Sequence, residues 1–135
     1  MYTIKNKDVV SADLLSVNEV NKLPRWILAN DHWWWLQSSG PINDHVTPFI
    51  VAGNVYSYGT DVNYPTGGVR PALKISNLPN LMTGETTEVF GLPAQYIGND
   101  SVLLCNPIGY HRFDAESNDY DKSEIKSYLD DAKSN

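Results

Sequence analysis

Cysteine is scarce in this chain, and long apolar runs are absent. With one cysteine among 135 residues, no disulfide can form within the chain, and we expect Cys105, in the apolar run SVLLCN, to pack as a small hydrophobic residue. No stretch reaches the roughly 18 consecutive apolar residues of a membrane-spanning helix. The start MYTIKNKDVV lacks the apolar core of a signal peptide. The sequence therefore predicts no membrane association and a cytoplasmic location.

Positive charge is scarce as well. The chain has 10 Lys and Arg residues against 16 Asp and Glu residues, which gives a formal net charge of −6 and an isoelectric point near 4.8. Nucleic-acid binding depends on basic side chains that neutralise phosphates. We therefore expect no direct nucleic-acid partner.

Patterns of catalytic or metal-binding residues are missing too. His32, His45 and His111 lack the spacing of zinc ligands, and the run Ser38–Gly40 is not a nucleophile elbow. Cys105 has no cationic sequence neighbour that would activate its thiol. The sequence therefore predicts no enzyme, no cofactor and no bound metal.

The residues that are present predict a single α+β domain over residues 1–135. Apolar residues make up 41% of the chain, enough for a core. Two short helices are expected. The first begins at a capping box of Ser16 and Glu19 and ends at Pro24, and the second is the C-terminal segment, which Asp121 or Ser123 can cap.

Short antiparallel strands are predicted between these helices. They comprise WWWLQS, a hairpin in which Gly53-Asn54 joins Phe49–Ala52 to Val55–Tyr58, a strand from Val69 to Ile75, and a hairpin around Gly98–Asp100. Pro71 cannot donate a ladder hydrogen bond, so its strand is expected at a sheet edge or with a bulge. The polar segment 76–89 is predicted to be a surface connection.

Three consecutive tryptophans dominate the first predicted strand. Strand alternation places Trp33 and Trp35 on one face and Trp34 on the other. Because large exposed apolar patches are rare on monomers, at least two of these indoles are expected in the core. Trp34 is the candidate that faces a ligand, and Trp26 is a second candidate anchor.

Two polar loops, Pro41–Pro48 and Gly59–Gly68, are the predicted contact surface. Beside Trp34, the candidate ligand-binding residues are Asn43, Asp44, Asp61, Asn63 and Tyr64. Converging oxygens of this kind suit a glycan or calcium. Asn and Asp are also common in ordinary turns, and no calcium-loop motif is present, so no metal is assigned.

Two charged features complete the candidates. Arg70 is expected to be partly buried against a carboxylate or carbonyl group, in a structural role. The segment 114–124 is strongly acidic and is typical of a solvated loop and helix start. Its functional alternative is a partner-binding surface made of Asp114, Glu116, Asp119, Asp121 and Glu124.

Four motifs, LLSVNEV, WWWLQSSG, AGNVYSYG and GGVRPALKI, together resemble an uncharacterised bacterial and phage domain family. That family has the signature WWLRS followed by GVRPAL, so Gln37 stands where the family has arginine. The resemblance implies a C-type-lectin-like fold without implying an activity. It also adds a virion-associated location to the cytoplasmic one.

The remaining segment, from VFGLPAQYIGND to KSEIKSYL, resembles the part with which that family normally begins, with Tyr128 in place of a tryptophan. Here the segment comes last. The chain is then either circularly permuted, or its last helix completes a neighbouring chain in a swapped homodimer.

These observations lead to two functional hypotheses. The first is a non-catalytic binding module of a phage or Gram-positive bacterium, which recognises a protein or glycan through loops on a C-type-lectin-like scaffold. The alternative is a small acidic phage inhibitor that occupies a basic groove of a host defence or nucleic-acid-handling protein.

Overall fold

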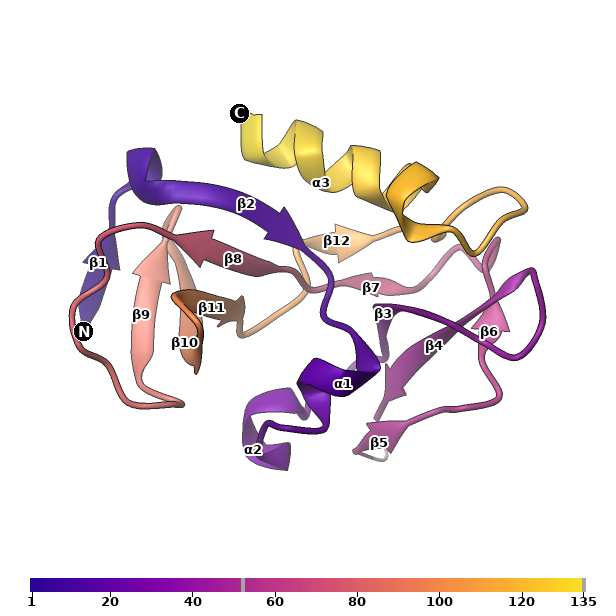
Figure 1. Ribbon diagram of the computed structural model, residues 1–135, viewed down its shortest axis with the longest axis horizontal. Coiled ribbons are helices and arrows are strands. Elements are labelled where there is room, and N and C mark those ends of the chain that lie inside the picture. Colours follow the sequence, from indigo (N-terminus) through magenta and orange to yellow (C-terminus); the bar gives the residue numbers. More distant parts are fainter. Residues whose placement is uncertain (52, 135) are drawn as a thin grey trace.

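The computed structural model, which describes residues 1–51 and 53–134, is an α+β structure with two sheets (Figure 1). The strands of the first sheet are β1 (Tyr2–Ile4), β2 (Val9–Asp13), β8 (Ala72–Ile75), β9 (Thr86–Val89), β10 (Leu92–Gly98) and β11 (Ser101–Leu104). Those of the second are β3 (Trp34–Ser39), β4 (His45–Ile50), β5 (Asn54–Val55), β6 (Thr60–Asp61), β7 (Gly68–Val69) and β12 (Gly109–Tyr110).

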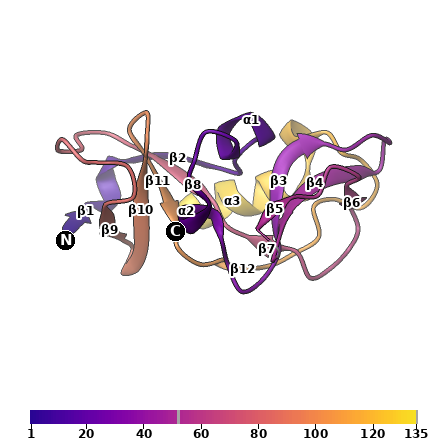
Figure 2. The same ribbon diagram turned by 90° about the horizontal axis from the view of Figure 1, so that it is seen from below.

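Most neighbouring strands run antiparallel, as expected. The first sheet has the order β1-β9-β10-β11-β8-β2, and the second has the order β12-β7-β3-β4-β5, with β6 also paired to β4. The pairs β1 with β9 and β3 with β7 are parallel. The two sheets lie at opposite ends of the long axis of the molecule (Figures 1 and 2).

Three α-helices accompany the sheets: α1 (Val17–Val20), α2 (Arg25–Leu28) and α3 (Glu124–Ser134). The predicted capping box is confirmed, because the Ser16 hydroxyl accepts the Glu19 N–H at 3.2 Å and the Glu19 carboxylate accepts the Ser16 N–H at 2.9 Å. Ser123 caps α3 by accepting the Lys126 N–H at 3.1 Å. The sequence did not predict α2, a single turn that follows Pro24.

Side chains on the two faces of the tryptophan strand, β3, pack into two different hydrophobic clusters. Trp35 belongs to a cluster that joins residues of both sheets to Ile125 and Leu129 of α3. Trp34 belongs to a second cluster, with Phe49 and the apolar residues of α1 and α2. The alternation predicted for this strand is therefore confirmed. Helix α3 docks on β2 of its own chain, so its apolar side is covered within one chain.

Arg70 and Pro71 lie where the chain passes between the sheets. Val69 ends β7 of the second sheet, and Ala72 begins β8 of the first. The expected single strand from Val69 to Ile75 is therefore wrong, as is the edge or bulge position of Pro71. Because proline cannot donate a ladder hydrogen bond, it suits this break between two strands.

Arg70 is 1% exposed and is held entirely by carbonyl groups. Its guanidinium donates to the oxygens of Leu104 at 2.7 Å, Leu28 at 2.8 Å and Ile27 at 2.7 Å. It also lies 4.8 Å from the centre of the Trp34 ring. Burial lowers the pKa of Arg70 to about 10, an effect partly opposed by the nearby Cys105. The predicted structural role holds, since this side chain ties the end of α2 to the first sheet.

Two other expectations about local structure need correction. The hairpin turn expected at Gly53-Asn54 is displaced, because Ile50 pairs with Asn54, so Asn54 is a strand residue of β5; Ala52 lies outside the described residues. The segment 76–89 is not all connection, because its end forms β9. The hairpin around Gly98–Asp100 is confirmed, with Asn99 and Asp100 at positive φ in its turn.

Candidate functional site

The tryptophan predicted to face a ligand is instead the one that is shielded. Trp34 is 0% exposed and packs on Phe49, with ring centres 5.3 Å apart. Its ring cannot reach a ligand, so this site assignment is wrong. Trp33, just before β3, is half-buried and turns its indole toward Tyr64, 5.7 Å away in an edge-to-face arrangement.

Trp33 forms one wall of an open groove on the second sheet. This hollow, of about 460 Å³, is called the aromatic groove below, and it is lined by Trp33, Pro48, Ile50, Val51, Tyr56, Thr60 and Tyr64. Tyr56 and Tyr64 are 41% and 50% exposed, so both rings remain accessible. The lining combines apolar ring faces with the hydroxyl groups of two tyrosines and a threonine.

The two loops predicted to converge do so beside this groove. His45 pairs with Asp61 across β4 and β6, and the Val62 N–H donates to the Asp44 carbonyl at 2.8 Å. The first of these loops is shorter than expected, because β4 begins at His45. These backbone contacts hold the two connections in fixed positions.

Among the predicted ligand residues, Tyr64 lines the groove, whereas Asp61 ends β6 and Asn43, Asp44 and Asn63 lie in the adjoining turns. Their polar groups serve the turns themselves. The Asp61 carboxylate accepts the Asn63 N–H at 3.3 Å, and the Asn43 carbonyl accepts the Asn118 N–H at 3.2 Å. These four residues frame the groove and do not form its wall.

Sequence reasoning missed Trp33, Ile50, Val51 and Tyr56 as groove residues, whereas Pro48 and Thr60 fall within the two predicted contact loops. Strand alternation showed that Trp33 and Trp34 face opposite sides but not which side is covered. That depends on α1 and α2, which pack over the Trp34 face. The two tyrosines at positions 56 and 58, shortly after the Gly53 turn, are the sequence feature that could have indicated Tyr56 as a groove residue.

The acidic segment 114–124 is ordered by its own hydrogen bonds. The Asp114 carboxylate accepts the backbone N–H groups of Glu116, Ser117 and Glu124. Desolvation acts to raise the pKa of Asp114, but these hydrogen bonds and Arg112 outweigh it and hold the pKa below its usual value.

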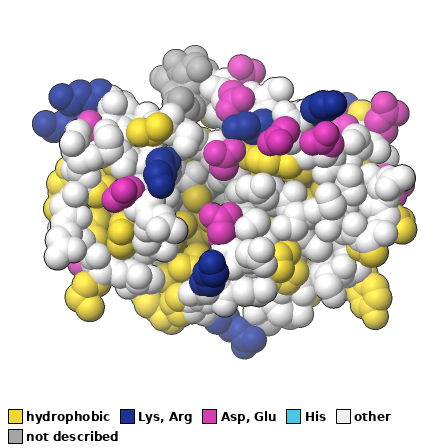
Figure 3. All heavy atoms as spheres, in the orientation of Figure 1, with side chains coloured by type: hydrophobic (Ala, Val, Ile, Leu, Met, Phe, Trp, Pro, Cys, Tyr) yellow, Lys and Arg dark blue, Asp and Glu magenta, His cyan; other side chains and the backbone are white. Residues whose placement is uncertain are grey.

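Two further acidic residues of this segment also form an ion pair or a hydrogen bond. Glu124 pairs with Arg112 at 3.0 Å, and Asp119 caps the 3₁₀ turn Tyr120–Lys122. Acidic side chains gather over α3 and the segment before it in Figure 3, with some basic ones among them.

Cys105 follows β11 and is half-buried, next to Arg70. Burial raises the pKa of its thiol, and Arg70 opposes that effect. Across the described residues, no group of three or more His, Cys, Asp or Glu side chains is arranged to hold a metal ion. No helix in residues 1–51 or 53–134 is long and apolar enough to cross a membrane.

Comparisons with protein-family models, with curated proteins and with solved structures found no match for this chain.

Proposed function

We propose that the protein is a non-catalytic binding module whose aromatic groove recognises a protein or glycan. The observation that carries the proposal is the open groove in which Trp33, Tyr56 and Tyr64 present aromatic surface. Aromatic side chains with a polar tip bury a large area at little entropic cost and still form hydrogen bonds. They are the residues that most often anchor binding interfaces.

The frame behind the groove supports this function. Trp35, Val46 and Val62 are all 0% exposed directly beneath the groove-bearing segments. The loops are held by strand pairing and backbone hydrogen bonds, so little conformational freedom is lost when a ligand binds.

The scaffold assignment is part of this proposal. We assign the α+β structure to the C-type-lectin-like class on the resemblance of WWWLQSSG and GGVRPALKI, and a phage or Gram-positive origin follows from the same motifs. A permuted order of segments fits a chain whose last helix docks on β2 of the same chain.

Defined ligand collections test the binding proposal. The protein is applied to a printed glycan array and to a displayed peptide library, and hits are titrated with Tyr56→Ala and Tyr64→Ala variants. Each variant should weaken binding by tenfold or more, about 1.4 kcal/mol, as for an interface anchor. Trp26→Ala is the matched control, because Trp26 is an exposed indole, 63% accessible, outside the groove. No specific hit, or hits unaffected by the groove variants, would overturn the proposal.

The acidic surface supports a second candidate, an inhibitor that occupies a basic groove of a host protein. Its support is the net charge of −6 together with the exposed Glu116 and Asp121 beside α3. The test is charge reversal at Asp119, Asp121 and Glu124, with heparin, a polyanion that competes for basic grooves, as the comparison. Partner affinity of the charge-reversed variant should fall steeply at low salt and less at high salt. Unchanged affinity at low salt would dismiss this candidate.

A further inference from the structure

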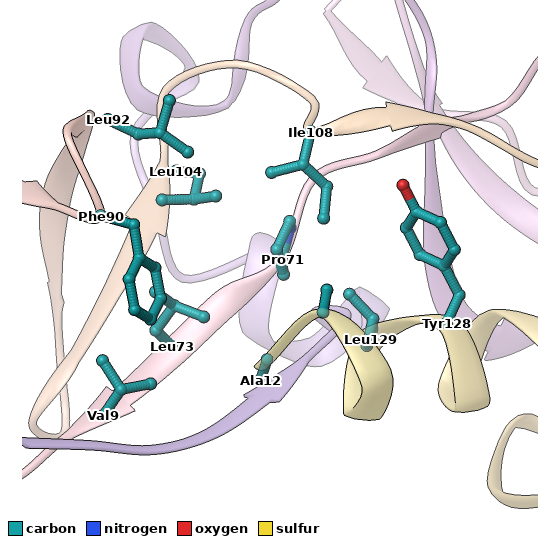
Figure 4. Close-up of a pocket in the computed structure, with 11 residues that line it drawn as sticks. Val9, Ala12, Pro71, Leu73, Phe90, Leu92, Leu104, Ile108, Tyr128 and Leu129 are labelled. Carbon is teal, nitrogen blue, oxygen red and sulfur yellow. The ribbon is translucent and has the colours of Figure 1, made fainter. Parts of the chain in front are cut away.

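A second hollow lies on the other sheet, between the β9–β10 turn and α3 (Figure 4). It has a volume of about 390 Å³ and is called the alkyl cleft below. Phe90, Leu73 and Leu104 form one side, and Ile108, Tyr128 and Leu129 form the other. None of these residues belongs to the aromatic groove, so the cleft is an independent site.

The walls of the cleft are rigid. Leu73 and Leu104 are 4% and 3% exposed on the neighbouring strands β8 and β11, and Leu129 is 1% exposed on α3. An apolar ligand would therefore meet a surface that is already formed. Binding to such a surface does not require side chains to be ordered first.

Phe90 is held at the cleft by an unfavourable backbone. Val89 pairs with Leu92, so Phe90 and Gly91 form a tight turn with φ of 53° and 75°. Glycine and asparagine suit these angles, whereas a bulky side chain there is strained. The ring is nevertheless 42% exposed and contributes to the cleft wall. A strained residue with an accessible side chain points to a role other than stability.

The chemistry of the lining is almost purely hydrocarbon. Among the described residues that line the cleft, none has a charged or carboxamide side chain, and the hydroxyl oxygen of Tyr128 is the one polar side-chain atom. That hydroxyl lies at the end nearest β12 and has no hydrogen bond to any described residue. A ligand that fits is apolar along its length and carries a hydrogen-bonding group at one end.

Size and charge narrow the choice of occupant. The cleft, of about 390 Å³, is smaller than one turn of an α-helix, which fills about 420 Å³ at a width of about 10 Å, so a slim chain fits it better than a helix does. The chain's net charge of −6 disfavours an anionic carboxylate end.

We infer that the alkyl cleft binds an unbranched alkyl chain with an uncharged polar end, taken up as a free amphiphile. The chain lies between Leu73 and Leu129, and its polar end hydrogen-bonds to the Tyr128 hydroxyl. The chemical class is that of fatty alcohols and their esters.

A homologous series of ligands tests this inference directly. 1-Butanol, 1-hexanol and 1-octanol are titrated into the full chain, and NMR shifts of the Leu73 and Leu129 methyl groups are followed. Each added methylene should raise the affinity about fourfold, the factor for burying one such group. Octanoate should bind more weakly than 1-octanol. Affinity that does not depend on chain length, or tighter binding of octanoate, would overturn the inference.

Two variants separate a ligand site from a structural contact. Phe90→Asn relieves the strained turn, so the unfolding temperature should stay the same or rise while 1-octanol affinity falls at least fivefold. Ala132→Phe fills the cleft from the exposed side of α3 and should have a similar effect on affinity. Tyr110→Ser removes an aromatic side chain, 59% exposed, outside the cleft, and should change neither quantity.

Two outcomes of the variant experiment contradict the inference. Unchanged 1-octanol affinity in both cleft variants would overturn it. Binding to phosphatidylcholine vesicles without binding of free 1-octanol would show that the cleft recognises a lipid bilayer. That result would overturn the inference that its ligand is a free amphiphile. Either result leaves the aromatic groove and its own test unaffected.

Discussion

The aromatic groove and the alkyl cleft have similar volumes, about 460 and 390 Å³, yet they are built from different parts of the fold. Residues of β4, β6 and the connections around them wall the groove, and two of its three rings, those of Tyr56 and Tyr64, end in hydroxyl groups. Strand residues of the first sheet, the connections at Phe90 and Ile108 and helix α3 wall the cleft, which has one hydroxyl at its end. The groove therefore suits a ligand with many polar groups that stays partly hydrated, whereas the cleft suits an apolar ligand that loses its hydration water on binding. Two binding chemistries can thus be separated on one small chain.

The two surfaces share a frame, and Arg70 is its centre. It contacts the ring of Trp34 on the face of the second sheet opposite the groove, and it binds the carbonyl of Leu104 on the cleft side. Replacing Arg70 by Leu leaves three buried carbonyl groups without a donor, so we expect a loss of about 3–5 kcal/mol in the free energy of unfolding. Urea unfolding followed by circular dichroism measures this loss.

Arg25→Leu is the matched control for Arg70→Leu, because Arg25 is an exposed arginine. Its effect should stay within about 0.5 kcal/mol. If Arg70→Leu lowers the free energy of unfolding by less than about 1 kcal/mol, Arg70 is not a shared structural support of the two sites.

Gly67→Ala should disturb the groove more than the cleft, because it displaces Trp35, whose ring centre lies 4.9 Å from that of the groove residue Trp33. A Cβ at Gly67 would lie 2.0 Å from Nε1 of Trp35, which is fully buried and donates to the His111 carbonyl at 2.8 Å. Forcing the ring aside should cost about 1–3 kcal/mol in the free energy of unfolding. Ligand binding in the groove should weaken, while 1-octanol affinity should hold, as measured by paired titrations.

Gly109→Ala is the matching change on the cleft side. There the added Cβ would lie 2.8 Å from the hydroxyl oxygen of Tyr128, the far end of a side chain that can shift. Its stability cost should stay below about 1 kcal/mol, and the change should appear in 1-octanol binding. Equal effects of both variants on both ligands would show that the sites are coupled.

The sequence predicted the elements that are determined locally. Alternation around Trp34 and Trp35, the capping box at Ser16 and the turn at Asn99 depend on near neighbours in the chain, and each is confirmed. The α+β class follows from these pieces. The C-type-lectin-like topology stays a proposal, because it rests on the resemblance alone.

The rest depends on contacts between distant segments. Leu73, Phe90 and Leu129 meet in the alkyl cleft, although no sequence pattern links them. In the same way, Trp34 is shielded because α1 and α2 fold over it, and a one-turn helix such as α2 has too few residues to show periodicity. Of the candidate residues from the two loops, Tyr64 could therefore be placed on the groove wall, whereas the four Asn and Asp residues lie outside it.

A final prediction concerns the effect of pH on the start of α3. Asp114 binds the first N–H of α3 and has a lowered pKa in the folded state, so its stabilisation is present above its unfolded pKa and is lost as pH falls through the folded value. Asp114→Asn should lower the free energy of unfolding by about 1 kcal/mol at neutral pH, and its difference from the wild type should vanish in acid.

Loosening the start of α3 also moves Tyr128 and Leu129, which the groove does not use. Acid should therefore weaken 1-octanol binding in the wild-type protein before it weakens a groove ligand, and Asp114→Asn should abolish that difference. Asp121→Asn, an exposed acid of the same segment, is the control and should leave the pH profile unchanged. If the Asp114→Asn deficit is as large in acid as at neutral pH, the lost contact is not the ionised carboxylate, because only the charged form gains from these hydrogen bonds as pH rises.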